Sequence, residues 1–253
     1  MWTDEQFDEL EQEERAITEE AIAAMLLILA NIKGDLEKEL REFYSKYGKD
    51  GVVTYQDARK WVSYKDHKRR ITWLLLMLSD QFNMLHDKLD TKFDNFLVEV
   101  IQKEQDFFDV NVDSNDVINA NWGTDNSTWY DRLSDDVDLW KTYVANDLKR
   151  SFMRQDNIED VIEQLDKRFT SMENVVQKLA MTESTAVGSI TRKEIFKELG
   201  IKKYRYYARE DERTCDVCGS LHGLVFPVSS YEIGVNASPM HPWCRCWEVP
   251  IVE

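Results

Sequence analysis

Five residues near the end of the chain have the types and spacing of metal ligands. Cys215 and Cys218 form a CxxC pair, and His241, Cys244 and Cys246 follow about two dozen residues later. Structural Zn²⁺ sites prefer four thiolate or imidazole ligands in a tetrahedron, and a CxxC turn supplies two of them at once. The sequence therefore predicts a knuckle that holds a structural zinc ion.

Five candidates compete for four positions around one ion. We expect Cys215, Cys218 and Cys244 to be three of the four ligands. His241 and Cys246 are the two candidates for the fourth position. His241 has the usual two-residue gap to Cys244, whereas Cys246 is separated from Cys244 by a single residue and would share one face of a strand with it. The fourth ligand stays open between these two. Buried free thiols and an oxidised cysteine pair are the other interpretations, although a reducing compartment favours metal ligands.

The number of protein ligands would decide whether such a site is structural or catalytic. Four ligands close a zinc site, whereas three leave a position for water and permit hydrolysis. Asp211, Glu212, His222 and His241 could then act as acid or base, but ion pairs, for example with Arg245, are the simpler interpretation. The sequence contains no HExxH, P-loop, GxSxG or GxGxxG motif. We therefore expect that the protein is not an enzyme. The alternative is a metal-dependent hydrolase or nuclease that uses this cluster.

A basic patch precedes the cysteines and alternates with tyrosines. It consists of Arg192, Lys193, Lys197, Lys202, Lys203, Arg205 and Arg209. Basic residues interleaved with aromatic ones often contact nucleic-acid phosphates, which makes this a candidate phosphate-binding site and a DNA-binding accessory factor an alternative function. Lysine near a helix end also favours the helix dipole, so a solvated helix end is the competing interpretation.

Composition limits the classes of function. The 253 residues carry 32 Lys plus Arg against 48 Asp plus Glu, a formal net charge of −16, so only a local patch could bind nucleic acid. The longest apolar run, residues 21–32, falls short of the ~20 residues that cross a bilayer. The acidic segment before it lacks the positive charge of a signal peptide. We therefore expect a cytosolic protein that does not enter a membrane.

Two long amphipathic helices are predicted in the first 110 residues. After a helix start at Thr3, apolar residues recur every three or four positions over residues 17–43. A turn at Gly48–Gly51 precedes a second helical stretch over residues 54–101, which contains no proline or glycine. Two such helices bury their apolar stripes by pairing, which predicts an antiparallel hairpin over residues 1–110.

A linker and a second helical region are predicted to follow. Residues 111–128 are rich in Asn, Asp, Ser and Gly, which is turn chemistry. Helical patterns resume after it, with Gly200 as the stop of the last helix. They cover residues 129–154, 158–169 and 172–199.

Past Gly200 the pattern changes to short strands. Extended patterns cover residues 202–209, 224–226 and 246–252, and together they could form a sheet that frames the cysteines. The expected fold is thus mainly α. A long N-terminal helical hairpin is followed by a helical domain over residues 129–253, which ends in a small β-sheet with the Cys/His knuckle from about residue 200.

Several short motifs surround and precede the cysteines. They are Asp211-Glu212-Arg213-Thr214-Cys215-x-x-Cys218, Leu221-x-Gly223-x-Val225-Phe226 and Pro239-x-His241-Pro242-x-Cys244-Arg245-Cys246, preceded by Trp129-Tyr130-Asp131-Arg132, Thr182-Glu183-x-Thr185-Ala186 and Gly200-Ile201-x-Lys203-x-x-Tyr206. Over roughly residues 128–252 the sequence resembles the phage Mu protein F-like minor head proteins, also called phage head morphogenesis proteins. His222 departs from this family, which commonly has an acidic residue there, so no role is carried over to that position.

The resemblance implies a minor head (capsid) protein of a tailed phage or prophage that acts in head morphogenesis. Its implied partners are the portal and other head proteins. Packaged DNA is a further candidate partner, and a DNA-binding accessory factor that is ejected with the genome is the alternative. Its implied location is inside the head of the virion, after assembly in the host cytoplasm. The N-terminal helices carry no motif of the family, and we expect them to make protein contacts, including oligomer contacts.

Overall fold

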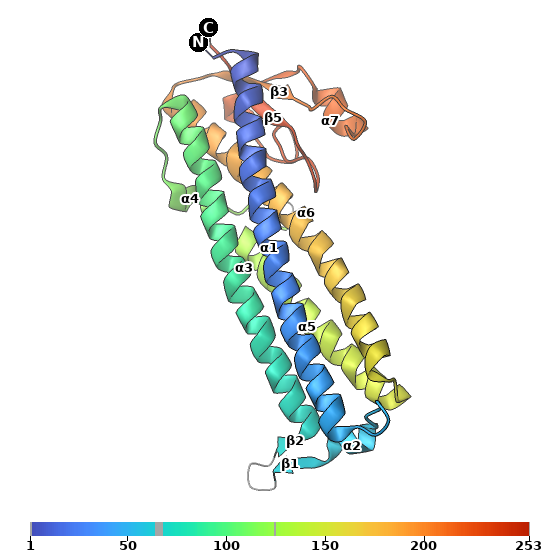
Figure 1. Cartoon of the computed structure of the whole chain (residues 1–253). Coiled ribbons are helices and arrows are strands. Elements are labelled where there is room, and N and C mark those ends of the chain that lie inside the picture. Colours follow the sequence, from blue (N-terminus) through green and yellow to red (C-terminus); the bar gives the residue numbers. More distant parts are fainter. Residues whose placement is uncertain (1, 64–67, 124, 253) are drawn as a thin grey trace. The chain divides into compact units, whose positions relative to one another are not determined.

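The structure is a computed structural model that describes residues 2–63, 68–123 and 125–252. Most of them lie in four long helices, α1 (Asp4–Tyr47), α3 (Arg70–Phe108), α5 (Trp129–Arg154) and α6 (Ile158–Glu198) (Figure 1). A small antiparallel sheet follows α6. The predicted mainly α fold with a C-terminal sheet is confirmed. Within these described ranges, no helix has an apolar stretch that would reach across a bilayer.

The chain forms two compact units, and the long helices contribute segments to both. Unit 1 consists of Met1–Ala23, Thr91–Arg132 and Gln177–Glu253, and unit 2 consists of Ala24–Asp90 and Leu133–Val176. The candidate metal ligands and the basic patch all belong to unit 1.

Unit 2 is built on apolar stripes with helical spacing. The α1 residues Met25, Leu29, Ile32, Leu36, Leu40 and Phe43 are all buried. The Phe43 ring lies 5.8 Å from that of Phe152 on α5 and 6.4 Å from that of Trp73 on α3. Burying one such side chain stabilises the fold by about 1.5–3 kcal/mol, so these stripes dominate the stability of the unit.

The second long helix does not begin at Thr54, so that prediction is wrong. Thr54 caps only a short helix, α2 (Tyr55–Arg59), and its Oγ1 accepts the N–H of Asp57 at 3.1 Å. Strands β1 (Trp61–Ser63) and β2 (Lys68–Arg69) then pair antiparallel before α3 begins. Tryptophan and valine favour strands, and the absence of proline and glycine permits a helix without requiring one. The side chain of Trp61, a residue of the helical stretch predicted over residues 54–101, lies outside the described part of the structure.

The later helices follow the predicted pattern with one difference. Helix α5 has the predicted bounds, whereas the two helices predicted over residues 158–199 are one continuous helix, α6. The hydroxyl of Thr170, at the expected break, donates back to the carbonyl oxygen of Asp166 at 3.0 Å and is satisfied within the helix. The segment predicted as a linker contains a short helix, α4 (Ser114–Ile118), which buries Val117 and Ile118.

The predicted stop of α6 at Gly200 is confirmed by its geometry. Gly200 has a φ of 67°, and its N–H donates to the carbonyl oxygen of Lys197 at 3.0 Å. The N–H of Ile201 donates to the carbonyl oxygen of Phe196 at 2.9 Å. This pair of bonds is a Schellman motif, in which a left-handed residue satisfies the last helical carbonyls.

The sheet of unit 1 has the strand order β4-β3-β5. The central strand β3 (Lys203–Tyr207) runs antiparallel to β4 (Val225–Pro227) and to β5 (Trp247–Ile251). Tyr204 and Tyr206 alternate with more exposed neighbours along β3 and are fully buried. This alternation is the period of two that a strand with one buried face requires.

Helices α1 and α3 pack antiparallel in unit 1, as predicted for the hairpin. Phe7 lies 5.8 Å from Phe108, ring to ring, and further along α1 Glu13 pairs with Lys103 at 2.8 Å. Phe7 and Phe108 share one buried cluster with Tyr204 of β3. The sheet is therefore anchored to the helices by a common apolar core.

Candidate metal centre

Two turns carry the five candidate ligands. Cys215 is the N-cap of α7 (Asp216–Leu221), and its sulfur accepts the N–H of Cys218 at 3.4 Å. His241, Cys244 and Cys246 lie on the loop that leads directly into β5, where the N–H of Cys244 donates to the carbonyl oxygen of His241 at 3.1 Å. The helix cap and the loop turn thus fix the two halves of the cluster.

The structure brings all five candidates together in two overlapping groups. Cys215, Cys218 and His241 form one group and Cys218, Cys244 and Cys246 form the other, with the ligand atoms of each group within 4.8 Å of one another. The Nε2 of His241 lies 3.2 Å from the sulfur of Cys215 and 3.3 Å from that of Cys218. The sulfurs of Cys218 and Cys244 are 3.9 Å apart.

The sulfur–sulfur separation fits the edge of a metal tetrahedron, whereas the two sulfur–nitrogen separations are shorter than such an edge. With Zn–S near 2.3 Å and Zn–N near 2.0 Å, sulfur–sulfur edges are about 3.8 Å and sulfur–nitrogen edges about 3.6 Å. All four cysteines are free thiols. The Nδ1 of His241 lies 2.7 Å from the carbonyl oxygen of Pro242, an arrangement that turns Nε2 toward the sulfurs. The cluster could therefore hold a metal ion, and Cys218 belongs to either choice of ligands.

The pKa values of the Cys215 and Cys218 thiols are shifted in opposite directions. The N–H of Cys218 donates to the sulfur of Cys215 and is the main cause of the lowered pKa of that thiol. The pKa of Cys218 is raised because its thiol is hydrogen-bonded to Cys244 and to Cys246 and is buried. Buried sulfurs that compete for protons in this way are well suited to a cation, which replaces the protons when it binds.

The surrounding polar residues are held in place by other partners. Arg245 donates to both oxygens of Asp211, at 2.6 and 2.7 Å, and this pair is the main cause of the lowered pKa of Asp211. The expected ion pair is thus confirmed. His222 lies outside both ligand groups among the described residues, with its Nδ1 at 3.1 Å from the carbonyl oxygen of Ala208. Both side chains are thus engaged by partners other than the five candidate ligands.

The basic patch does not form one face. Arg192 is buried, Lys197 pairs with Glu194 at 2.7 Å, and Arg209 pairs with Glu11 at 2.7 Å. The ammonium of Lys193 lies 5.8 Å from the ring centroid of Tyr231. Lys202 and Lys203 are exposed and Arg205 is half-buried. Phosphate binding by these exposed residues stays a prediction, while Arg192 is directed into the interior.

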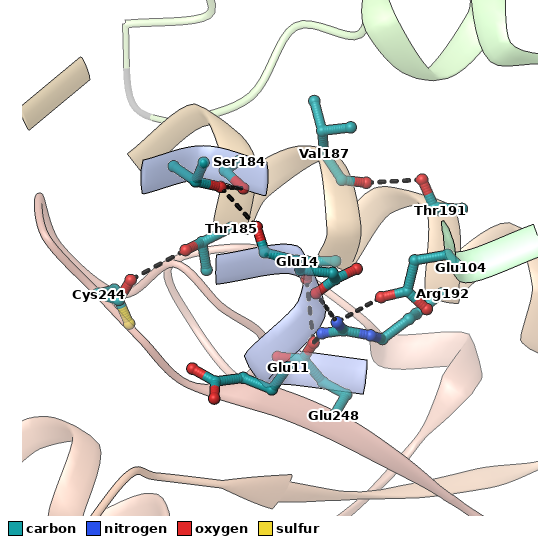
Figure 2. A network of polar contacts seen from close by, with 12 residues as sticks. Glu11, Glu14, Glu104, Ser184, Thr185, Val187, Thr191, Arg192, Cys244 and Glu248 are labelled. Atoms are coloured by element: carbon teal, nitrogen blue, oxygen red, sulfur yellow. Dashed lines mark hydrogen bonds and ion pairs between the residues drawn. The ribbon is translucent and has the colours of Figure 1, made fainter. Parts of the chain in front are cut away.

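Arg192 lies in a buried polar network that sequence reasoning missed (Figure 2). Its guanidinium contacts Glu14 of α1 at 2.8 Å, Glu104 of α3, and Glu248 of β5 at 3.7 Å. Glu104 and Glu248 have no exposed surface. A usable signal was present, because Glu14 and Glu104 occupy apolar-stripe positions of their helices, four residues after Leu10 and Val100.

Unit 1 is therefore a helical unit with a three-stranded antiparallel sheet and a buried Cys/His cluster that could hold a metal ion. No curated protein and no solved structure matched the chain. Residues 142–249 match the family model described as Phage Mu protein F like protein, a span that contains all five candidate ligands. Over this span the chain is similar to the family of Phage Mu protein F like proteins, which confirms the resemblance.

Proposed function

We propose that the protein is a structural minor head protein of a tailed phage or prophage, associated with the portal inside the head. The observation that carries this proposal is the family match over residues 142–249. The protein assembles in the host cytoplasm and remains in the virion. Its long helices supply surfaces for the portal and other head proteins, and no catalytic step is required of it.

The cluster acts in this proposal as a structural zinc knuckle. Zinc is held by Cys215, Cys218 and His241, whose Nε2 lies within 3.3 Å of both sulfurs, and by Cys244, whose sulfur lies 3.9 Å from that of Cys218. Bound zinc supplies folding free energy to a module whose sheet has only three short strands. The engagement of Asp211 by Arg245 and of His222 by Ala208 supports a structural role over a hydrolytic one.

Co-expression with the portal protein of the same phage or prophage tests this proposal. The complex would be separated by size-exclusion chromatography, and zinc would be measured in the same peak. Co-elution with about one zinc per chain is the expected result. Elution as a lone monomer would contradict the portal association, and a metal-free peak would contradict the zinc knuckle.

The variant Cys215→Ser tests the zinc knuckle independently of the association with the portal. Loss of this ligand should make the segment after residue 200 sensitive to protease, because the metal contributes to its folding. Val217→Ser is the matched control, since Val217 lies in the same turn and is 54% exposed. Unchanged protease resistance of Cys215→Ser would exclude a structural metal.

A further inference from the structure

The buried network of Figure 2 has more carboxylates than cations. Arg192 is the one guanidinium in contact with Glu14, Glu104 and Glu248 among the described residues. The carboxylate of Glu248 has three further donors, the N–H of Ser238 at 2.6 Å and the hydroxyls of Tyr231 at 2.9 Å and Ser189 at 3.3 Å. Glu14 and Glu104 are therefore left to share a single cation.

The backbone of α6 leaves room for both of these carboxylates. A Cβ on Gly188 would lie 3.5 Å from Oε1 of Glu14 and 3.6 Å from Oε1 of Glu104. The Oε1 of Glu14 and the Oε2 of Glu104 are buried and have no hydrogen-bond partner within the described chain. Two ionised carboxylates in such a place would leave an uncompensated buried charge, which is strongly unfavourable.

We propose that Glu104 carries a proton at neutral pH, and that this proton latches residues 4–23 of α1 to the rest of unit 1. The protonated carboxyl of α3 removes the excess charge, so that Glu14 of α1 and Arg192 of α6 form a pair. Loss of the proton would leave two ionised carboxylates, Glu104 of α3 and Glu14 of α1, at one guanidinium, and their repulsion would separate the α1 segment from α3.

The environment of Glu104 supports this assignment. Its pKa is raised well above the usual range, first by burial and then by Glu14, against the opposing effect of Arg192. The neighbouring charged groups are already paired. Glu11 and Glu13 of α1 pair with Arg209 and Lys103, and Arg15 and Arg245, the two cations that line a small cavity with Glu14, pair with Glu19 and Asp211. Deprotonation is therefore expected to open the α1 segment locally.

Hydrogen exchange measured by mass spectrometry over pH 6.5–9 tests the latch on the full chain. After correction for intrinsic exchange, the opening equilibrium constant of residues 4–23 should rise by up to about tenfold per pH unit, because opening releases one proton. In Glu104→Gln, which is neutral at every pH, this rise should disappear. Equal pH dependence in the wild type and in Glu104→Gln would overturn the proposal.

Two further variants keep the test decisive. Glu14→Gln removes the carboxylate that competes with Glu104 for Arg192, so it should also lose the pH dependence, and it answers the question if Glu104→Gln does not fold. Glu99→Gln alters an exposed glutamate on the same helix and should behave as the wild type. Retention of the wild-type slope in Glu14→Gln would contradict the latch.

Discussion

Arg132 and Glu183 form an ion pair at 2.9 Å that joins the start of α5 to α6 within unit 1. Glu183 also accepts the indole N–H of Trp122 at 2.8 Å, and the guanidinium of Arg132 lies 4.3 Å from the Trp122 ring centroid. Both partners of the pair belong to motifs that carried the family resemblance. Those motifs, about 50 residues apart in sequence, thus meet in one partly buried contact.

Glu183→Gln should change how stability depends on pH. Burial is the main cause that raises the pKa of Glu183 from 4.5 to about 6. Because the folded pKa exceeds the unfolded value, the folded state binds more protons between pH 4.5 and about 6. The contribution of Glu183 to the free energy of unfolding should therefore fall by about 2 kcal/mol as the pH rises through this window.

Urea unfolding of both proteins at pH 4.5–7 checks this prediction. The difference in unfolding free energy between wild type and Glu183→Gln should vary across the window and be constant above it. Glu198→Gln, at an exposed position near the end of the same helix, is the control. Parallel pH profiles for wild type and Glu183→Gln would show that the carboxyl is not perturbed by burial.

The fourth metal ligand can be decided by two substitutions. The Nε2 of His241 lies within 3.3 Å of two cysteine sulfurs, whereas Cys246 is grouped only with Cys218 and Cys244. We expect His241→Ala to lose most of its zinc and Cys246→Ser to keep about one ion per chain. Metal analysis of the purified proteins measures this, and the reverse result would assign the position to Cys246.

Tyr206→Phe should weaken metal binding although the tyrosine is not a ligand. Its hydroxyl donates to the sulfur of Cys218 at 3.5 Å, and groups that orient a ligand typically contribute 10–100-fold to affinity. Competition with a chelator would measure the change. Tyr204→Phe is the matched control, because the Tyr204 hydroxyl donates to Asn236 instead. Equal zinc affinity in Tyr206→Phe and wild type would exclude the contact.

The sequence predicted the elements whose signals are local. The period of the apolar residues located α1 and α5, the left-handed preference of glycine located the end of α6, and cysteine spacing located the cluster. The start of α3 was missed because neither proline nor glycine marks it. Residue types that merely favour a strand, such as Val62, carry less information than a helix breaker.

Side-chain direction was the part that sequence could not supply. Arg192 and Lys193 are adjacent, yet the first is buried among carboxylates and the second contacts Tyr231 at the surface of α6. Only the partners of α6 decide which of two neighbouring basic residues faces inward. Those partners, Glu14 and Glu248, lie far away in the sequence, so a basic run alone suggested a surface patch.

Two glycine substitutions should change stability in opposite directions. An added Cβ meets no atom within 4 Å at either Gly34 or Gly200, so packing does not distinguish the two sites. Gly34 lies in the interior of α1, where alanine should raise the free energy of unfolding by about 0.5–1 kcal/mol. Gly200 has a φ of 67°, where a Cβ costs about 1–2 kcal/mol.

Chemical denaturation of Gly34→Ala, Gly200→Ala and the double variant measures both effects. The two sites are independent if the double variant shows the sum of the single changes. Stabilisation by Gly200→Ala would mean that the end of α6 does not need a left-handed residue. In that case the path from α6 into β3, which places Tyr206 against the cysteines, would rest on the Phe196 and Ile201 contacts alone.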